Sequence, residues 1–224
     1  ISNGIGQPLS ATLLADLRTV RLSLSSALAT GTYTLQTSGV KDVLGNESLA
    51  QTADFQFLKI ETALEFDILI NEIMADPTPT TGLPEVEWLE LFNRSAKTID
   101  LATLRIQDAA GAPLQLPSYP FPPNSYIVLT ANANVTAMQA TTNGSVIGIA
   151  VSVTLLNNDG DVLTISDLNG NVIDRVAYSV GWHTDPDKSS GGWSLESINP
   201  PFPRAGSGNW QSGPQPLRGA PRGR

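Results

Sequence analysis

The stretch EVEWLELFN, residues 85–93, decides the fold because apolar and acidic side chains alternate along it. Such alternation is typical of a β-strand with one buried face. The alternation passes through Val86 and Trp88, slips by one position, and resumes at Leu89 and Leu91. An uncorrected slip would turn Leu89 and Leu91 to the wrong face. We therefore expect a β-bulge near Trp88–Leu89, in a central strand of a two-layer sheet structure.

Further segments typical of strands occur along the whole chain, with turn residues between them. They span residues 19–24, 31–40, 54–57, 66–74, 98–107, 126–130, 161–166, 172–178 and 193–198. The Asn169-Gly170 pair predicts a tight hairpin between two of them. Many short strands at near-regular spacing predict an all-β fold, a β-sandwich. We divide the chain into a first unit at 1–58, a linker at 59–65, a sandwich at 66–213 and a Gly/Pro/Arg tail at 214–224.

The composition is that of a folded chain with an acidic surface. Of 224 residues, 41% are hydrophobic and 15% are charged, and the formal net charge is −8. A negative surface repels phosphate backbones, which disfavours DNA as a partner. The absence of cysteine excludes thiol catalysis, thiolate metal sites and disulfides. No apolar run reaches the roughly 18 residues of a membrane-spanning helix, so we expect no membrane span.

The first unit contains the runs GTYTL (31–35), GVKDVLGN (39–46) and FQF (55–57). In these runs it resembles the C-terminal part of a bacterial Ig-like domain of the surface-layer type. It implies a smaller, partial Ig-like β unit, because the opening strands of that family have no counterpart here. Either a segment outside this sequence or packing against another element would complete the unit.

The second unit contains a series of recognisable motifs, which are INEIMADP (70–77), EWLELFN (87–93), FPP (121–123), LLNNDGD (155–161), DLNGNVIDRVAY (167–178), WSLE (193–196) and NW (209–210). In these motifs it resembles the bacterial lamin tail domain, an Ig-like β-sandwich. The resemblance implies a module without catalytic residues, appended to secreted or surface proteins. Eukaryotic members are the tails of nuclear intermediate-filament proteins and bind proteins and DNA. The sequence departs from the family at residues 101–104, where Leu-Ala-Thr-Leu replaces Leu-x-Gly-Trp.

The loop at residues 181–187 is a candidate ligand-binding site. It holds the only histidine, His183, between Trp182 and Asp185. An imidazole and a carboxylate could serve as ligands there, although a histidine in such a loop is more often simply solvated. Trp182, flanked by glycine and polar residues, is the aromatic side chain that we expect to be most exposed to a sugar or peptide.

The loop NNDGD at residues 157–161 is a candidate calcium site. Asn157, Asp159 and Asp161 place oxygen ligands at close spacing, but the downstream bidentate glutamate of an EF-hand is missing. The alternative is a turn that opens the next strand.

A second acidic group could bind calcium or form the acid and base of a glycosidase. It comprises Glu72, Asp76, Glu85 and Glu87. On alternating strands such residues more often form the solvent face.

The sequence thus leads us to expect a non-catalytic structural, protein-docking or adhesion module of a secreted or cell-surface bacterial protein. Its partners would be other protein domains of the same or a surface protein. The alternative is a carbohydrate- or calcium-dependent binding module attached to a catalytic domain elsewhere, with glycans as partners. A hydrolase is the third hypothesis. Calcium is the one cofactor left open. Residues 204–224 contain four arginines and no acidic residue, and we interpret them as a connector to the next domain. The alternative is contact with an anionic partner or with the acidic body of the same protein.

Overall fold

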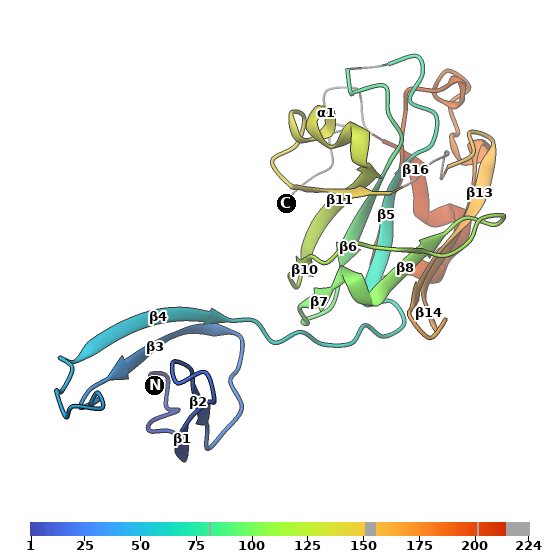
Figure 1. Ribbon diagram of the computed structural model, residues 1–224. Helices are drawn as coiled ribbons and strands as arrows, with labels where there is room; N and C mark the ends of the chain where they lie inside the picture. Colours follow the sequence, from blue (N-terminus) through green and yellow to red (C-terminus); the bar gives the residue numbers. More distant parts are fainter. Residues whose placement is uncertain (81, 151–155, 201, 214–224) are drawn as a thin grey trace. The chain divides into compact units, whose positions relative to one another are not determined.

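The computed structural model describes residues 1–80, 82–150, 156–200 and 202–213. Its chain divides into two compact units, unit 1 (Ile1–Lys59) and unit 2 (Ile60–Arg224), both built from β-strands (Figure 1). The longest α-helix in the described ranges, α1 (Val135–Gln139), has five residues. None of the described helices has the length and apolar character that crossing a membrane requires. The predicted tail at 214–224 lies outside the described residues.

Unit 1 consists of two antiparallel strand pairs. They are β1 (Ser10–Leu13) with β2 (Val20–Ser23), and β3 (Gly31–Thr37) with β4 (Gln51–Phe57). The loop between β3 and β4 is folded around Asp42, whose carboxylate accepts the N–H groups of Leu44 and Asn46 at 2.8 and 2.9 Å. These hydrogen bonds explain why the predicted turn at residues 42–46 forms: a short acidic side chain replaces the backbone partners that a turn leaves unsatisfied.

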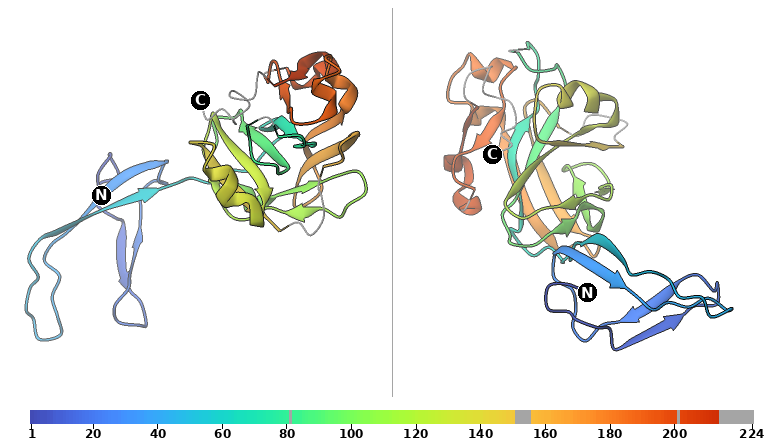
Figure 2. Two further views of the ribbon diagram at one scale, coloured as in Figure 1. Left: turned by 90° about the horizontal axis from the view of Figure 1, so that it is seen from above. Right: turned by 90° about the vertical axis from the view of Figure 1, so that its left-hand side faces the viewer.

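Unit 2 is a sandwich of two main sheets (Figures 1 and 2). The first, in the order β12-β11-β6-β5-β15-β16, contains β5 (Ile68–Met74), β6 (Trp88–Asn93), β11 (Ser125–Ala131), β12 (Ser145–Ile149), β15 (Leu195–Ser197) and β16 (Trp210–Ser212). The second, in the order β14-β13-β8-β9, contains β8 (Leu104–Gln107), β9 (Leu114–Gln115), β13 (Gly160–Asp167) and β14 (Val172–Ser179). A small ribbon pairs β7 (Ile99–Asp100) with β10 (Pro120–Phe121). Five 3₁₀ turns lie in the described ranges: η1 (Leu101–Thr103), η2 (Asn132–Asn134), η3 (Val180–Trp182), η4 (Lys188–Ser190) and η5 (Pro203–Asn209).

The core lies between the two sheets and confirms the predicted all-β sandwich. Ile70 and Leu91 of the six-stranded sheet and Ile106 and Leu163 of the four-stranded sheet belong to one buried cluster. Each such side chain contributes about 2 kcal/mol by leaving water. Part of the predicted linker belongs to this unit: Ala63 is buried in the same cluster.

The residues that replace the family's Leu-x-Gly-Trp form the short turn η1. Leu101 and Leu104 are both fully buried in the core. The carboxylate of Asp100, the residue before the turn, accepts the Ala102 N–H at 3.0 Å and caps the turn. Two leucines and a capped turn therefore fill this position of the sandwich.

The predicted hairpin at Asn169-Gly170 is confirmed. β13 and β14 pair antiparallel on either side of it. The Asp167 carboxylate accepts the backbone N–H groups of Asn169 and Asn171, at 2.9 and 2.8 Å. The side chain of Asn171 also donates to it and is the main cause of the lowered pKa of Asp167.

The structure contains a β-bulge, but the predicted position near Trp88–Leu89 is wrong. From Trp88 to Asn93, β6 pairs with β11 in an unbroken register. The register shift lies in the neighbouring strand β5, between Ile70 and Glu72, so that Asn71 is the extra residue.

The apparent slip in β6 arises because both faces of this sheet are buried. Leu89 and Leu91 face the main core. Trp88 faces the opposite way, into a second apolar cluster with Met74 and Met138. A sheet covered on both sides needs no bulge to accommodate two apolar residues in succession.

Candidate functional site

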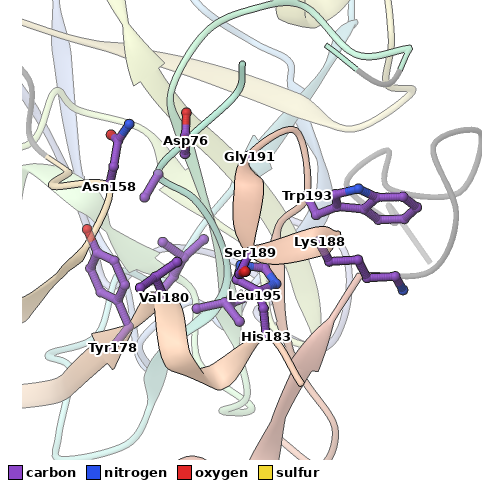
Figure 3. Close-up of a pocket in the computed structure, with 12 residues that line it drawn as sticks. Asp76, Asn158, Tyr178, Val180, His183, Lys188, Ser189, Gly191, Trp193 and Leu195 are labelled. Atoms are coloured by element: carbon purple, nitrogen blue, oxygen red, sulfur yellow. The ribbon is translucent and has the colours of Figure 1, made fainter. Parts of the chain in front are cut away.

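A pocket on unit 2 lies where the end of β5 meets the loops that follow β14. The pocket is partly open to solvent. Polar groups reach it from several segments, namely Asp76, Asn158, Tyr178, His183, Lys188 and Ser189. Figure 3 shows Asn158 and Tyr178 on one side and Lys188 and Trp193 on the opposite side. A concave site with a few convergent polar groups is the usual form of a ligand site.

The wall of this pocket depends on a close contact between two loops. The Gly192 N–H donates to the carbonyl oxygen of Asp76 at 2.7 Å. Gly191 has φ +99°, and a Cβ placed on it would lie 1.9 Å from the carbonyl oxygen of Thr78. Only glycine combines this backbone conformation with so close an approach.

His183, one of the predicted ligand-binding residues, lines the pocket. Its Nδ1 lies 2.9 Å from Ser212 Oγ. Burial lowers the pKa of the imidazole, and the Lys188 ammonium lowers it further. The ring is therefore neutral at pH 7. In a serine triad a carboxylate would orient and stabilise the histidine, whereas here the charged group that acts on it is a cation.

Trp182 is not the exposed aromatic residue that the sequence predicts. It packs against the main core, and its ring lies 5.8 Å from that of the buried Trp210. The indole that lines the pocket is Trp193, with the Lys188 ammonium 4.4 Å from its centroid. Gly181 and the polar residues after Trp182 misled the prediction. Trp193 follows the pair Gly191-Gly192, and this pair was the signal that could have identified Trp193 as the pocket residue.

Asp185 lies apart from this pocket's lining. It is exposed, and its carboxylate accepts the Asp187 N–H at 3.0 Å while its carbonyl oxygen accepts the Lys188 N–H. The predicted trio thus separates: His183 lines the pocket, Trp182 joins the core and Asp185 shapes a turn.

The candidate calcium loop forms a turn in which N–H groups surround a carboxylate. Asp161 accepts the side-chain amide N–H of Asn157 and the backbone N–H of Ala109, the latter at 3.1 Å. Asp159 is exposed, and its carbonyl oxygen accepts the Val180 N–H. Asn157 therefore turns its donor, rather than its oxygen, toward Asp161. Across the described ranges, no three carboxylate or imidazole side chains gather closely enough to hold a metal ion.

The second acidic group is dispersed. Glu72 is buried in β5, where it accepts a hydrogen bond from Ser194 Oγ at 2.5 Å. Glu85 is exposed and accepts the Thr78 hydroxyl at 2.8 Å, and Asp76 lines the pocket. The expected solvent face is thus wrong for Glu72, because the outer side of this sheet is covered.

The comparisons with known proteins agree with this architecture. The family model described as Lamin Tail Domain matches residues 62–179, which is more than half of the chain and most of the sandwich. None of the curated proteins matches the chain. The chain therefore belongs to the lamin tail domain family, and unit 2 is its Ig-like β-sandwich.

Proposed function

We propose that this chain is a non-catalytic docking module of a bacterial secreted or cell-surface protein, and that unit 1 provides the docking surface. The observation that supports this most is the exposure of large apolar side chains on the strand pairs of unit 1. The partner of this docking surface is the apolar face of another β-sheet. That sheet belongs to a domain of the same protein or of a neighbouring surface protein.

The β1–β2 pair has one apolar face and one polar face. Leu13 lies opposite Val20, and Ala11 lies opposite Leu22, so these four side chains share a face. Leu13 and Val20 are 56% and 51% exposed. Arg21 lies opposite Thr12, and both point to the other face.

The β3–β4 pair repeats this pattern. Tyr33 lies opposite Phe55, and their rings stack at 5.6 Å. Leu35 and Ala53 form the next pair on this face. Within unit 1, Ile5 and Tyr33 are the apolar residues that are buried. Two strands with so small a core are marginally stable alone, and an apolar sheet face is stabilised by a second layer.

The hydrogen bonding of polar side chains in unit 2 also supports a docking role. His183 and Glu72 are engaged with Ser212 and Ser194. Catalysis by acid and base would require two such groups around one reacting atom. Lamin tail domains are generally non-catalytic, which supports the same proposal.

Sedimentation velocity of the full chain at rising concentration tests the proposal, because a second copy carries the same apolar faces and can act as the partner sheet. We expect association that weakens in the double variant Leu13→Thr/Val20→Thr, which keeps strand propensity but removes apolar area. The control, Arg21→Thr, changes the opposite face and should associate like the unaltered chain. Association that is absent at every concentration, together with no binding of a hydrophobic dye, would contradict the docking role.

The pocket beside Trp193 favours a second candidate function, a carbohydrate- or calcium-dependent binding module. Asp76 and Asn158 supply hydrogen-bonding groups there, and Trp193 supplies an aromatic surface. A glycan array, with and without calcium, tests it. Binding that is lost in Trp193→Ala would support this second function, and an array without signal in either condition would remove it.

A further inference from the structure

One edge of β4 in unit 1 has no partner among the described strands. β3 and β4 form a sheet of their own and pair in an unbroken register along the whole of β4. The other side of β3 is occupied, because the Ser2 N–H donates to the Thr34 carbonyl oxygen at 3.1 Å and the Thr34 N–H donates to Ser2 Oγ at 2.8 Å. Figure 1 accordingly shows β3 between β4 and the N-terminus. The open edge of this sheet is therefore that of β4.

The hydrogen bonds of Thr34 show which residues of β4 present their backbone groups to the open edge. Thr34 directs its N–H and C=O away from β4, and it lies opposite Asp54. In an antiparallel pair both residues of such a position point outward, and these positions alternate with hydrogen-bonded ones. The N–H and C=O groups of Thr52, Asp54 and Gln56 therefore line the open edge.

The sequence of β4 lacks the features that usually protect an exposed edge. Natural proteins keep such edges apart with proline, lysine or a β-bulge. The run QTADFQF (51–57) contains neither proline nor lysine, and its pairing with β3 shows no register shift. Ala53 and Asp54 are exposed, and Phe55 and Phe57 are half-buried. This edge is therefore suited to receive another strand.

The sequence of β4 is complementary to itself in one antiparallel register. When Phe55 lies opposite the Phe55 of a second copy, Asp54 lies opposite Gln56 and Ala53 lies opposite Phe57. Asp54 and Gln56 then exchange backbone hydrogen bonds, because both direct their N–H and C=O groups to the edge. The two Phe55 residues form a non-hydrogen-bonded pair, in which side chains lie closest together.

The neighbouring registers are less favourable. The register that overlaps all seven residues of β4 places Asp54 opposite the Asp54 of the second copy, and directly opposed like charges destabilise a sheet. A register centred on Ala53 places two alanines together and sets Gln51 opposite Phe55. It therefore brings less apolar area together than the register centred on Phe55.

The favoured register also joins the apolar faces of the two hairpins. Tyr33 lies opposite Phe55 within one copy, and their rings stack at 5.6 Å. The twofold axis of an antiparallel edge pair is perpendicular to the sheet, so the Tyr33–Phe55 stacks of both copies lie on the same face. Aromatic rings then form a row across the joined sheet, and aromatic cross-strand pairs stabilise sheets.

We propose that the open edge of β4 is the site at which two copies of this chain pair, in the register centred on Phe55. The product is a four-stranded sheet in which the two β4 strands are central. This inference rests on the docking role of unit 1, since strands that overlap only at residues 53–57 need apolar contacts for additional stabilisation. The edge determines how the two copies align, and the apolar side chains stabilise the aligned pair.

Sedimentation velocity of full-chain variants at Gln56 tests the pairing. In the proposed dimer each Gln56 faces Asp54 of the other copy, whereas within one copy it lies opposite Thr32. Gln56→Lys should therefore lower the Kd of association about fivefold, and Gln56→Glu should raise it about fivefold. The matched controls are Gln36→Lys and Gln36→Glu, which make the same charge changes at an exposed position of β3. They should differ from each other by less than about twofold.

An equimolar mixture separates pairing between copies from charge effects within one copy. The acidic variant Gln56→Glu and the basic variant Asp54→Lys/Gln56→Lys each oppose like charges in their own dimers. Mixed, they should form heterodimers with a Kd at least about tenfold below that of either homodimer. A mixture that associates no more tightly than its components would overturn the pairing.

Cysteine cross-linking tests the register directly, because the unaltered chain contains no cysteine. The Cα atoms of the two Phe55 residues should lie about 4.5 Å apart, so Phe55→Cys should give disulfide-linked dimers on oxidation. Ala53→Cys, on the same face of β4, is the control and should remain uncross-linked. Cross-linking of Ala53→Cys that equals or exceeds that of Phe55→Cys would overturn the proposed register.

The same measurements distinguish failure of the edge pairing from failure of the docking role. Equal Kd values for Gln56→Lys and Gln56→Glu, with association still weakened by Leu13→Thr/Val20→Thr, would overturn the edge pairing and leave the docking role in place. An unaltered chain that stays monomeric at every concentration would overturn both.

Discussion

The carboxylate of Asp174 in β14 accepts a hydrogen bond from the backbone N–H of Ile70 in β5, at 2.8 Å. This bond joins the two sheets of the sandwich at a point where β5 is irregular. Asp174 is almost fully buried, and burial raises its pKa to about 6, against the opposing effect of the N–H groups of Ile70 and Arg175. The bond between the sheets is therefore sensitive to pH.

The stability of the sandwich should fall as pH rises from about 4 to about 6. The pKa of Asp174 is higher in the folded state than the 3.9 or so of an unfolded aspartate, so the folded chain binds the proton more tightly. The protonated carboxyl group of Asp174 stabilises the fold fully below about pH 4, and this contribution is lost as pH rises through about 6. It amounts to about 3 kcal/mol of unfolding free energy. Urea unfolding between pH 4 and 7 measures it.

Asp174→Asn tests the origin of this pH dependence, because the amide oxygen can still accept the Ile70 N–H and carries no charge. The variant should lose the decline between pH 4 and 6. The control is Asp167→Asn at an exposed turn, where the pKa of the aspartate is lowered and the decline should persist. A decline that is unchanged in Asp174→Asn would show that another group causes it.

Gly191→Ala should destabilise unit 2 by about 3 kcal/mol, because the new Cβ would meet the Thr78 carbonyl oxygen while the backbone stays strained. Gly170→Ala is the matched control: it has φ +89°, and its Cβ would meet no described atom within 4 Å. Gly170→Ala should lower the free energy of unfolding by about 1 kcal/mol. Thermal unfolding compares the stabilities of the two variants. Equal losses of stability would mean that Gly191 does not closely approach the Thr78 carbonyl oxygen.

Trp182→Ala should act on stability rather than on binding. Since Trp182 packs on the core beside Trp210, its truncation should cost about 2–3 kcal/mol. Trp193→Ala, at the pocket rim, should lower the free energy of unfolding by less. Denaturant unfolding of both variants checks this order. A neutral Trp182→Ala would restore the sequence-based expectation of an exposed ring.

His183 should titrate with an NMR midpoint below 6.5, since burial and Lys188 both lower its pKa. A histidine with a depressed folded pKa contributes stability that is complete above the unfolded value of about 6.5 and is lost as pH falls through the lower folded value. As the only histidine, its ring signals are unambiguous. Lys188→Met should raise the midpoint only part of the way, because burial is the larger cause. A midpoint at or above 6.5 would contradict the buried environment.

Local patterns predicted most of the strands and turns of this chain. The single strand predicted at residues 98–107 is wrong, because η1 divides it into β7 and β8, which belong to different sheets. Asn169-Gly170 predicted the hairpin because the residues that determine it are adjacent in sequence. The alternation in residues 85–93 predicted the central strand β6 but not its surroundings. What covers the far side of a sheet is set by distant segments such as α1, so the second cluster around Trp88 and the bulge at Asn71 escaped prediction.

The candidate site was harder to predict for the same reason. Trp182 and Trp193 both follow glycine, and only tertiary packing directs one to the core and the other to the pocket. Glu72 appeared to be solvent-exposed because an acidic residue in an alternating strand usually is. Its burial depends on residues far away in sequence.

Hydrogen exchange of the full chain, compared at low and high concentration, tests the docking role most directly. Amides of β1–β4 should exchange rapidly in the dilute chain while those of β5, β6 and β11 remain protected. At high concentration, protection should appear in β1–β4 of the unaltered chain and of Arg21→Thr, but not of Leu13→Thr/Val20→Thr. If β1–β4 are as well protected as the sandwich in the dilute monomer, unit 1 is complete by itself and is not a docking surface.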